Sequence, residues 1–132
     1  MLMEQCLRIL CFEGRITRKM WWMLIGKTAL FEIIALSVFI WSSGLAYDLD
    51  VLVLRNAFPV IWLEGISFVI FTAFLLIITF FAHIKRFHDI GKSGSNCLWI
   101  LLPFIGPLYI LFILGFSKSD PNPNIYGQPC EQ

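Results

Sequence analysis

Residues 85–94, KRFHDIGKSG, gather the side chains of this sequence whose types could do chemistry. His88 stands next to Asp89, and a histidine beside a carboxylate is a common pairing for general acid–base catalysis. Basic residues and a GKSG segment could instead bind phosphate. The stretch therefore has three possible roles: catalysis on lipid phosphate, binding of an anion, or the structural end of a helix.

A nucleotide-binding P-loop and a metal site both lack the residues that they need. A P-loop requires G-x-x-x-x-G-K-[ST], but Arg86 stands where its first glycine should be. His83 and His88 point about 140° apart on a helix, so they do not share a face. None of the four cysteines forms a C-x-x-C pair. We expect no catalytic residue, no metal site and no cofactor.

The structural role explains most of the stretch. Arg86 and His88 fit the C-terminus of a helix, where the helix dipole favours cations. Gly91 fits the left-handed position that follows a helix, and Ser95 or Asn96 is then expected to cap the next helix. The role that remains open is anion binding, because basic residues beside a membrane attract anionic headgroups.

The composition indicates that lipid surrounds the elements that position this stretch. The chain has 132 residues, of which 58% are hydrophobic and 14% charged, whereas a soluble domain has roughly 25% charged residues. Between residues 66 and 82 the only polar groups are Ser67, Thr72 and Thr79. That face is too narrow for a water-soluble helical bundle. We expect an all-α membrane protein with no nucleic-acid partner.

Three segments are long enough to cross a bilayer, which takes roughly 20 apolar residues. They are residues 20–45, 58–84 and 97–116, and they predict a three-segment transmembrane helical bundle. Pro103, Gly106 and Pro107 interrupt the third segment. It is therefore either a kinked span or a re-entrant hairpin, and the kinked span is favoured because membranes tolerate interrupted helices.

The basic residues predict the orientation, since loops rich in Lys and Arg stay in the cytoplasm. Seven of them lie before the first segment or between the second and third, and two lie elsewhere outside the segments. We expect an amphipathic cytoplasmic N-terminus at 1–19, an external loop at 46–57 and a cytoplasmic turn at 85–96. A full third span places the tail, 117–132, outside.

One acidic residue, Glu32, falls near the middle of the first segment. A carboxylate at that depth is costly unless it is paired or protonated. An antiparallel second segment brings Thr72 to a similar depth. We expect Glu32 to face the bundle interior, to stay protonated and to bond to a polar group such as Thr72. A role for Glu32 in ion or proton transport is the functional alternative.

Three stretches resemble the motifs of one family: FEGRITRKMWW at 12–22, IKRFHDIGKSG at 84–94 and PNPNIYGQP at 121–129. The family is domain of unknown function 805, small bacterial inner-membrane proteins. The resemblance carries its motif positions onto a cytoplasmic cluster (Gly14, Arg15, Arg18, Arg86, His88, Asp89, Gly91, Ser93 and Gly94), Trp22, and a tail motif (Asn124, Tyr126 and Gly127). Asp89 is then the expected ion-pair partner of Arg15 or Arg18. Tail residues that join the cluster require the tail inside and favour the hairpin.

These observations predict a single membrane domain in the bacterial inner membrane with a cytoplasmic N-terminus. The first hypothesis is a non-enzymatic protein whose Arg/His/Asp cluster binds a partner protein or anionic lipid headgroups. The alternative is a small transporter or channel subunit that uses Glu32. A membrane enzyme that acts on lipid phosphate through His88 and Asp89 ranks last. A homo-oligomer or a membrane-protein partner fits the first two hypotheses.

Overall fold

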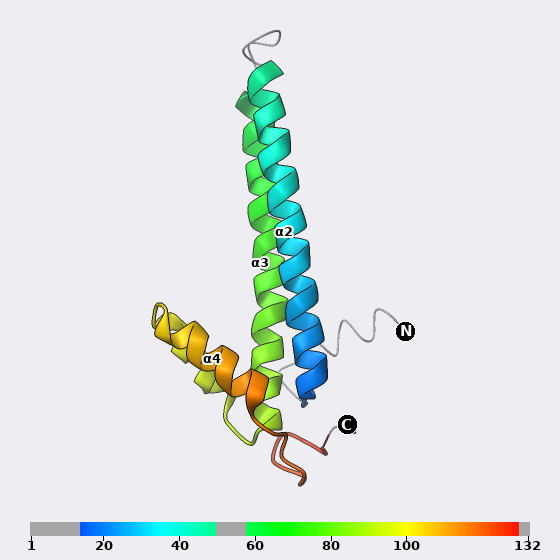
Figure 1. Ribbon diagram of the computed structural model, residues 1–132, viewed down its shortest axis with the longest axis vertical. Coiled ribbons are helices and arrows are strands. Elements are labelled where there is room, and N and C mark those ends of the chain that lie inside the picture. The colour runs from blue at the N-terminus through cyan, green and yellow to red at the C-terminus, as the bar shows by residue number, and fades with distance from the viewer. Residues whose placement is uncertain (1–13, 50–57, 130–132) are drawn as a thin grey trace. The chain divides into compact units, whose positions relative to one another are not determined.

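A computed structural model describes residues 14–49 and 58–129 of the chain (Figure 1). Helices make up its regular structure, together with one isolated bridge between Asn124 and Gly127 within the described residues. In chain order the elements are α2 (Arg18–Leu49), α3 (Phe58–Asp89), the 3-10 helix η2 (Gly94–Leu101) and α4 (Ile105–Phe116). The prediction of an all-α fold is confirmed for the described residues.

Two of these helices, α2 and α3, are long and apolar enough to cross a membrane, over Arg18–Leu45 and Trp62–Asp89. They correspond to the first two predicted segments. The external loop predicted at 46–57 lies mostly outside the described residues, and so does most of the N-terminal stretch predicted at 1–19.

The chain divides into two compact units. Unit 1 comprises residues 1–26 and 77–132, and unit 2 comprises residues 27–76. Unit 1 therefore holds the start of α2, the end of α3, η2, α4 and the tail. All residues of the predicted cytoplasmic cluster and of the tail motif fall in unit 1.

In unit 2, α2 and α3 run antiparallel. Thr72 donates a hydrogen bond to Glu32 (3.3 Å), and Ser42 donates one to Glu64 (3.2 Å). Between these pairs, the rings of Phe39 and Phe68 stack with centroids 4.9 Å apart. Residue numbers rise along one helix as they fall along the other, which is the signature of antiparallel packing.

Unit 1 has a small apolar core, which includes the fully buried side chains of Trp21, Phe87, Ile110 and Leu114. The core joins the first turns of α2 to the last turns of α3 and to α4. Trp21 also meets the ring of His83 edge-on, with centroids 5.7 Å apart. This core holds the elements that carry the polar cluster.

The third predicted segment folds into a hairpin of η2 and α4 (Figure 1). Gly106 comes so close to η2 that an added Cβ would lie 1.8 Å from the carbonyl oxygen of Trp99. Between the helices, Phe104 has a positive φ of 64°, so the helical path is broken there. The segment is therefore a hairpin rather than one kinked helix, and the three-segment transmembrane bundle stays a prediction.

The polar turn also begins later than predicted. Helix α3 continues past Ile84 to Asp89 because Lys85–Asp89 are buried against the rest of unit 1. Gly91 then takes the left-handed conformation (φ 72°), as predicted. The amide of Lys92 donates to the Phe87 carbonyl (2.9 Å) and that of Gly91 to the His88 carbonyl (3.1 Å), which is the Schellman pattern.

Candidate functional site: a buried arginine clamp

Asp89, the last residue of α3, is the centre of the polar cluster. Its Oδ1 accepts a hydrogen bond from Arg15 Nε (3.1 Å), and its Oδ2 accepts one from Arg86 Nη1. Arg86 precedes Asp89 by three residues, so the two share a helix face. All three side chains are at most 1% exposed. We call Asp89, Arg15 and Arg86 the arginine clamp.

Arg15 attaches the start of the described chain to the tail. Its Nη1 donates to the carbonyl oxygen of Asn122 (2.9 Å) and to that of Gly127 (3.4 Å). Its Nη2 donates to the carbonyl oxygens of Asp120 and Asp89 (3.3 Å). One side chain therefore binds residues 105 to 112 positions away along the chain.

Arg86 attaches α3 to the end of α4. Its Nε donates to the carbonyl oxygen of Leu114 (3.0 Å), and its Nη2 donates to that of Ser117 (2.6 Å). Its Nη1 also donates to Ser119 Oγ (3.0 Å). The last carbonyls of a helix have no partner within it and carry its negative pole. A guanidinium at this position satisfies them and fixes where α4 ends.

The tail motif packs onto the same cluster. The rings of Tyr126 and His88 stack with centroids 3.7 Å apart and planes within 1°. Asn124 Nδ2 donates to the His88 carbonyl (2.9 Å), and Asn124 Oδ1 accepts the Tyr126 amide (3.0 Å). The tail thus returns to the end of unit 1 that carries residues 85–94. This contact between the tail and the cluster is the one expected for the hairpin alternative.

The clamp leaves little chemistry available. Each carboxylate oxygen of Asp89 bonds an arginine, so Asp89 does not orient His88 as an acid–base partner. His88 is 7% exposed and lies under Tyr126, which limits access to its ring. Both guanidinium groups face internal acceptors, whereas an anion site needs donors that point to a ligand. The geometry is that of a structural lock.

No group of His, Cys, Asp and Glu in the described ranges could hold a metal ion. Cys97 is a small residue of the apolar core and is 3% exposed.

The remaining predicted positions shape the chain around the clamp. Ser93 caps η2 by accepting the amide of Ser95, so the cap predicted at Ser95 or Asn96 is wrong by two or three residues. Gly94 passes so close to α3 that an added Cβ would lie 2.8 Å from Ile84 Cγ2. Gly14 and Gly127 have positive φ angles of 98° and 132°.

Two other predicted positions lie at the rim of the cluster or beside it. Arg18 is exposed, so of the two partners expected for Asp89 only Arg15 forms the ion pair. Trp22 Nε1 donates to the carbonyl oxygen of Gly115 (3.3 Å), which ties α2 to α4.

Some members of the cluster are absent from the sequence-based prediction. The i, i+3 spacing of Arg86 and Asp89 could have revealed their pairing. The acceptors at Leu114, Ser117 and Asn122 are backbone carbonyls, and no residue type marks such a group. They follow only from the hairpin and the returning tail.

The geometry agrees with the three motifs, which meet at this one cluster. The chain matches the family described as protein of unknown function (DUF805) over residues 9–128. The chain belongs to this family. No curated protein sequence and no solved structure matches it.

Proposed function

We propose that this DUF805 protein is a non-enzymatic integral protein of the bacterial inner membrane. In this proposal α2 and α3 cross the bilayer, and the clamped end of unit 1 faces the cytoplasm and binds anionic lipid headgroups. The observation that carries the proposal is the exposed positive charge of one polar end, which the arginine clamp assembles from the start of α2, the end of α3, the end of α4 and the tail.

The exposure of the long helices supports the membrane location. Large apolar side chains such as Ile33, Ile40, Ile70 and Leu76 are at least 61% exposed. A helix in the core of a soluble protein would bury such residues, whereas acyl chains solvate them. The excess of basic residues on one side of these helices supports the cytoplasmic orientation.

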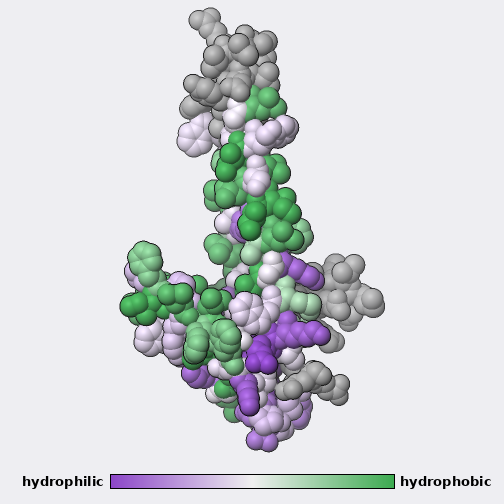
Figure 2. Space-filling model, viewed as in Figure 1, coloured by the Kyte–Doolittle hydropathy of each residue, from purple (hydrophilic) through white to green (hydrophobic). Residues whose placement is uncertain are grey.

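Four exposed cations stand a few residues along the chain from the clamp or from the carbonyls that it binds, and we assign anion binding to this rim. Its members are Arg18, Lys19, Lys92 and Lys118. Among the described residues of unit 1, Asp89 is buried and Asp120 is half-buried, so exposed positive charge prevails. Figure 2 shows hydrophilic side chains gathered around the tail. Each basic residue near an anionic surface adds about 1 kcal/mol of attraction.

The other two hypotheses have less support. The transporter alternative rests on Glu32, whose one partner in the described residues is the hydroxyl of Thr72; a relay needs a chain of such groups. The enzyme hypothesis needs an accessible His88 oriented by Asp89, and the clamp takes both oxygens of that carboxylate.

Lipid selection tests the proposed function. The protein is purified in nanodiscs of phosphatidylcholine with a minority of phosphatidylglycerol, and native mass spectrometry measures the enrichment of the anionic lipid around it. We expect enrichment for the wild type. We expect it to fall by about fivefold for each rim cation removed, in line with about 1 kcal/mol each.

The matched control is Lys27→Gln, which removes an exposed lysine of unit 2 and should leave the enrichment unchanged. A quadruple rim variant (Arg18→Gln, Lys19→Gln, Lys92→Gln and Lys118→Gln) that enriches phosphatidylglycerol as the wild type does would refute the assignment to the rim.

A further inference from the structure

We propose that the η2–α4 hairpin is a re-entrant membrane element, inserted among the acyl chains of the leaflet that borders the clamped end. The inference rests on the proposed membrane location of α2 and α3 and adds a third point of contact with the bilayer. The molecules that contact the hairpin are then the lipids of that leaflet and not a second protein.

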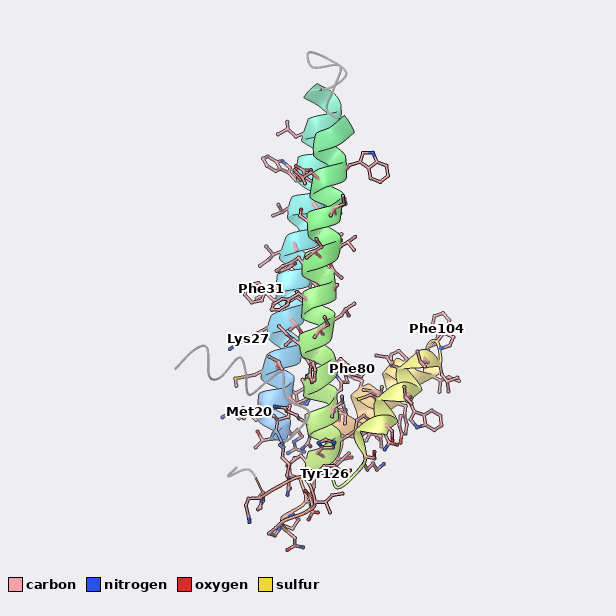
Figure 3. All side chains as sticks on the ribbon, turned by 180° about the vertical axis from the view of Figure 1, so that it is seen from behind. Met20, Lys27, Phe31, Phe80, Phe104 and Tyr126 are labelled. Atoms are coloured by element: carbon pink, nitrogen blue, oxygen red, sulfur yellow. The ribbon has the colours of Figure 1, made fainter. Side chains whose placement is uncertain are left out.

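The surface of the hairpin is suited to hydrocarbon. From Gly94 to Phe116 the sequence has no charged residue. At the tip, Leu101, Phe104 and Ile105 are 75%, 85% and 70% exposed. Figure 3 shows Phe104 at the end of the hairpin that lies away from Tyr126 and the tail. Such a concentration of exposed apolar area is unfavourable in water.

The backbone of the tip is suited to hydrocarbon as well. Irregular backbone is costly in a membrane because its polar groups lack water. Here the amides of Leu102, Ile105 and Gly106 donate to the carbonyls of Trp99, Pro103 and Leu102. Pro103 and Pro107 have no amide hydrogen to satisfy. The turn therefore presents few unpaired donors.

The two ends of the hairpin show that it does not cross the bilayer. It begins beside Ser93, directly after the turn that ends α3, and its last carbonyls are held by Arg86 of the clamp. Helix α4 has 12 residues, which at about 1.5 Å each give about 18 Å. The hydrocarbon core is about 30 Å thick, so the hairpin can enter it and return, but cannot span it.

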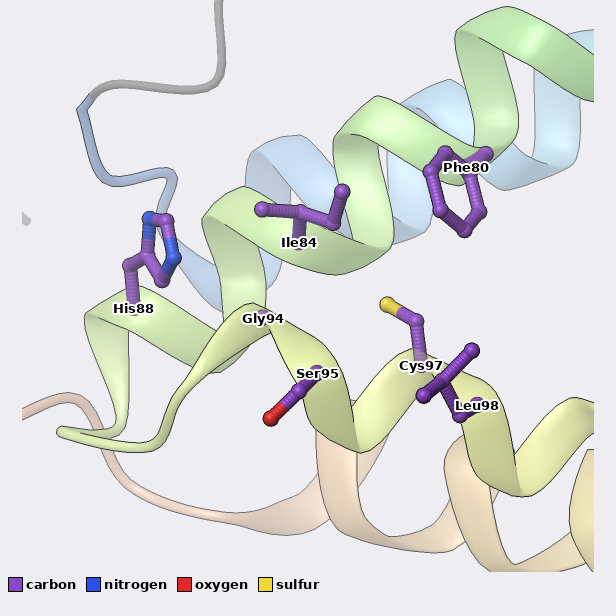
Figure 4. Close-up of a pocket in the computed structure, with 7 residues that line it drawn as sticks. All are labelled: Phe80, Ile84, His88, Gly94, Ser95, Cys97 and Leu98. Atoms are coloured by element: carbon purple, nitrogen blue, oxygen red, sulfur yellow. The ribbon is translucent and has the colours of Figure 1, made fainter.

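The hairpin surface continues onto α3 across a shallow groove of about 360 Å³. Phe80 and Ile84 line it on α3, and Cys97 and Leu98 line it on η2 (Figure 4). Phe80 and Leu98 are 43% and 62% exposed. An acyl chain in this groove would contact α3 and the hairpin together, so one apolar surface joins the proposed span to the hairpin.

Spin-label accessibility tests the insertion. In a variant whose four cysteines are replaced by alanine, single cysteines at Phe104, Ile70 and Ile125 carry a nitroxide in the protein reconstituted into bilayers. Ile70 reports on α3, and Ile125, which is 91% exposed in the tail, reports on the aqueous side. At Phe104 we expect the ratio of oxygen to nickel-chelate collisions to match that at Ile70 and to exceed that at Ile125 severalfold.

The outcomes separate this inference from the proposed function. A water-like ratio at 104 with a lipid-like ratio at 70 overturns the hairpin insertion and leaves the two spans intact. Water-like ratios at both positions overturn both. Labelling of the cysteine at 104 by an impermeant thiol reagent from the side opposite Ile125 shows a complete span and also overturns the inference.

A second measurement keeps the native cysteines in place. Benzoylphenylalanine incorporated for Phe104 should crosslink to phospholipid on illumination, whereas the same group at Ile125 should not. Crosslinks from position 104 to a second protein chain, with none to lipid, would overturn the lipid assignment.

Discussion

Unit 1 and unit 2 stabilise neighbouring stretches of the same two helices by different means. In unit 1, Arg15, Arg86 and Asp89 are buried and bond to each other and to backbone carbonyls from distant segments. In unit 2, Glu32 and Glu64 are half-buried, and each accepts a hydrogen bond from one hydroxyl of the facing helix.

The difference indicates which of the two units is more sensitive to single substitutions. A network of buried charges is costly to leave incomplete, because each unpaired member keeps its desolvation penalty. Packing between two apolar helices is spread over many small contacts, so the loss of one is tolerated. Single substitutions should therefore have large effects in unit 1 and small effects in unit 2.

The largest effect is expected for Asp89→Asn. The amide has nearly the shape of the carboxylate but leaves two buried guanidinium groups without a counter-charge. Breaking a buried pair in this way costs about 3–5 kcal/mol. Thermal unfolding of the purified protein in detergent should show the loss, and proteolysis should show release of the tail.

Asp120→Asn is the matched control for this substitution. The side chain of Asp120 is half-buried, and Arg15 bonds to its carbonyl oxygen, which the substitution leaves in place. Equal unfolding temperatures for Asp89→Asn and the wild type would show that the clamp does not stabilise unit 1.

The next largest effect is expected when a glycine is replaced by alanine, once in unit 1 and once in unit 2. In Gly106→Ala the new Cβ would lie 1.8 Å from the Trp99 carbonyl oxygen, so η2 and α4 must separate, at a cost of about 1–3 kcal/mol. In Gly65→Ala the Cβ meets no atom within 4 Å, and alanine favours the helix by up to about 1 kcal/mol. Unfolding in detergent should show effects of opposite sign. Equal destabilisation by both would contradict the close packing of the hairpin.

The same contrast explains what the sequence predicts well. Hydropathy and length define α2 and α3, because each is apolar over enough residues to cross a membrane. The pair of Glu32 and Thr72 follows from the depth of each residue along an antiparallel pair, and the structure confirms it. Gly91 follows from local turn chemistry. Each of these features depends on residues that are near in sequence or on simple helix geometry.

What the sequence predicts poorly depends on contacts between distant segments. Pro103, Gly106 and Pro107 fit both a kinked span, which the sequence analysis favours, and a hairpin. The choice depends on Arg86, which binds the carbonyls of Leu114 and Ser117. The sequence-based hypothesis gave Arg15 and Arg86 a role in anion binding. It did not include the returning tail, which supplies hydrogen-bond acceptors to both side chains. Composition does not distinguish an arginine that awaits a ligand from one that binds its own backbone.

The smallest effect is expected in unit 2, for Glu32→Gln. The amide oxygen of glutamine can accept the same bond from Thr72, and the side chain keeps nearly the same shape. The free energy of unfolding should change by less than about 1 kcal/mol. Thr72→Val, which removes the hydroxyl and keeps the shape, should cost about 1 kcal/mol because it leaves the acid without this donor.

Ion flux into proteoliposomes tests whether Glu32 also has a role in transport. If Glu32 is a packing residue, the wild type and Glu32→Gln should have equal flux, at the level of protein-free vesicles. Flux that the wild type supports and Glu32→Gln abolishes would contradict the packing role and assign transport to the carboxyl group of Glu32. Unit 2 would then be the functional region.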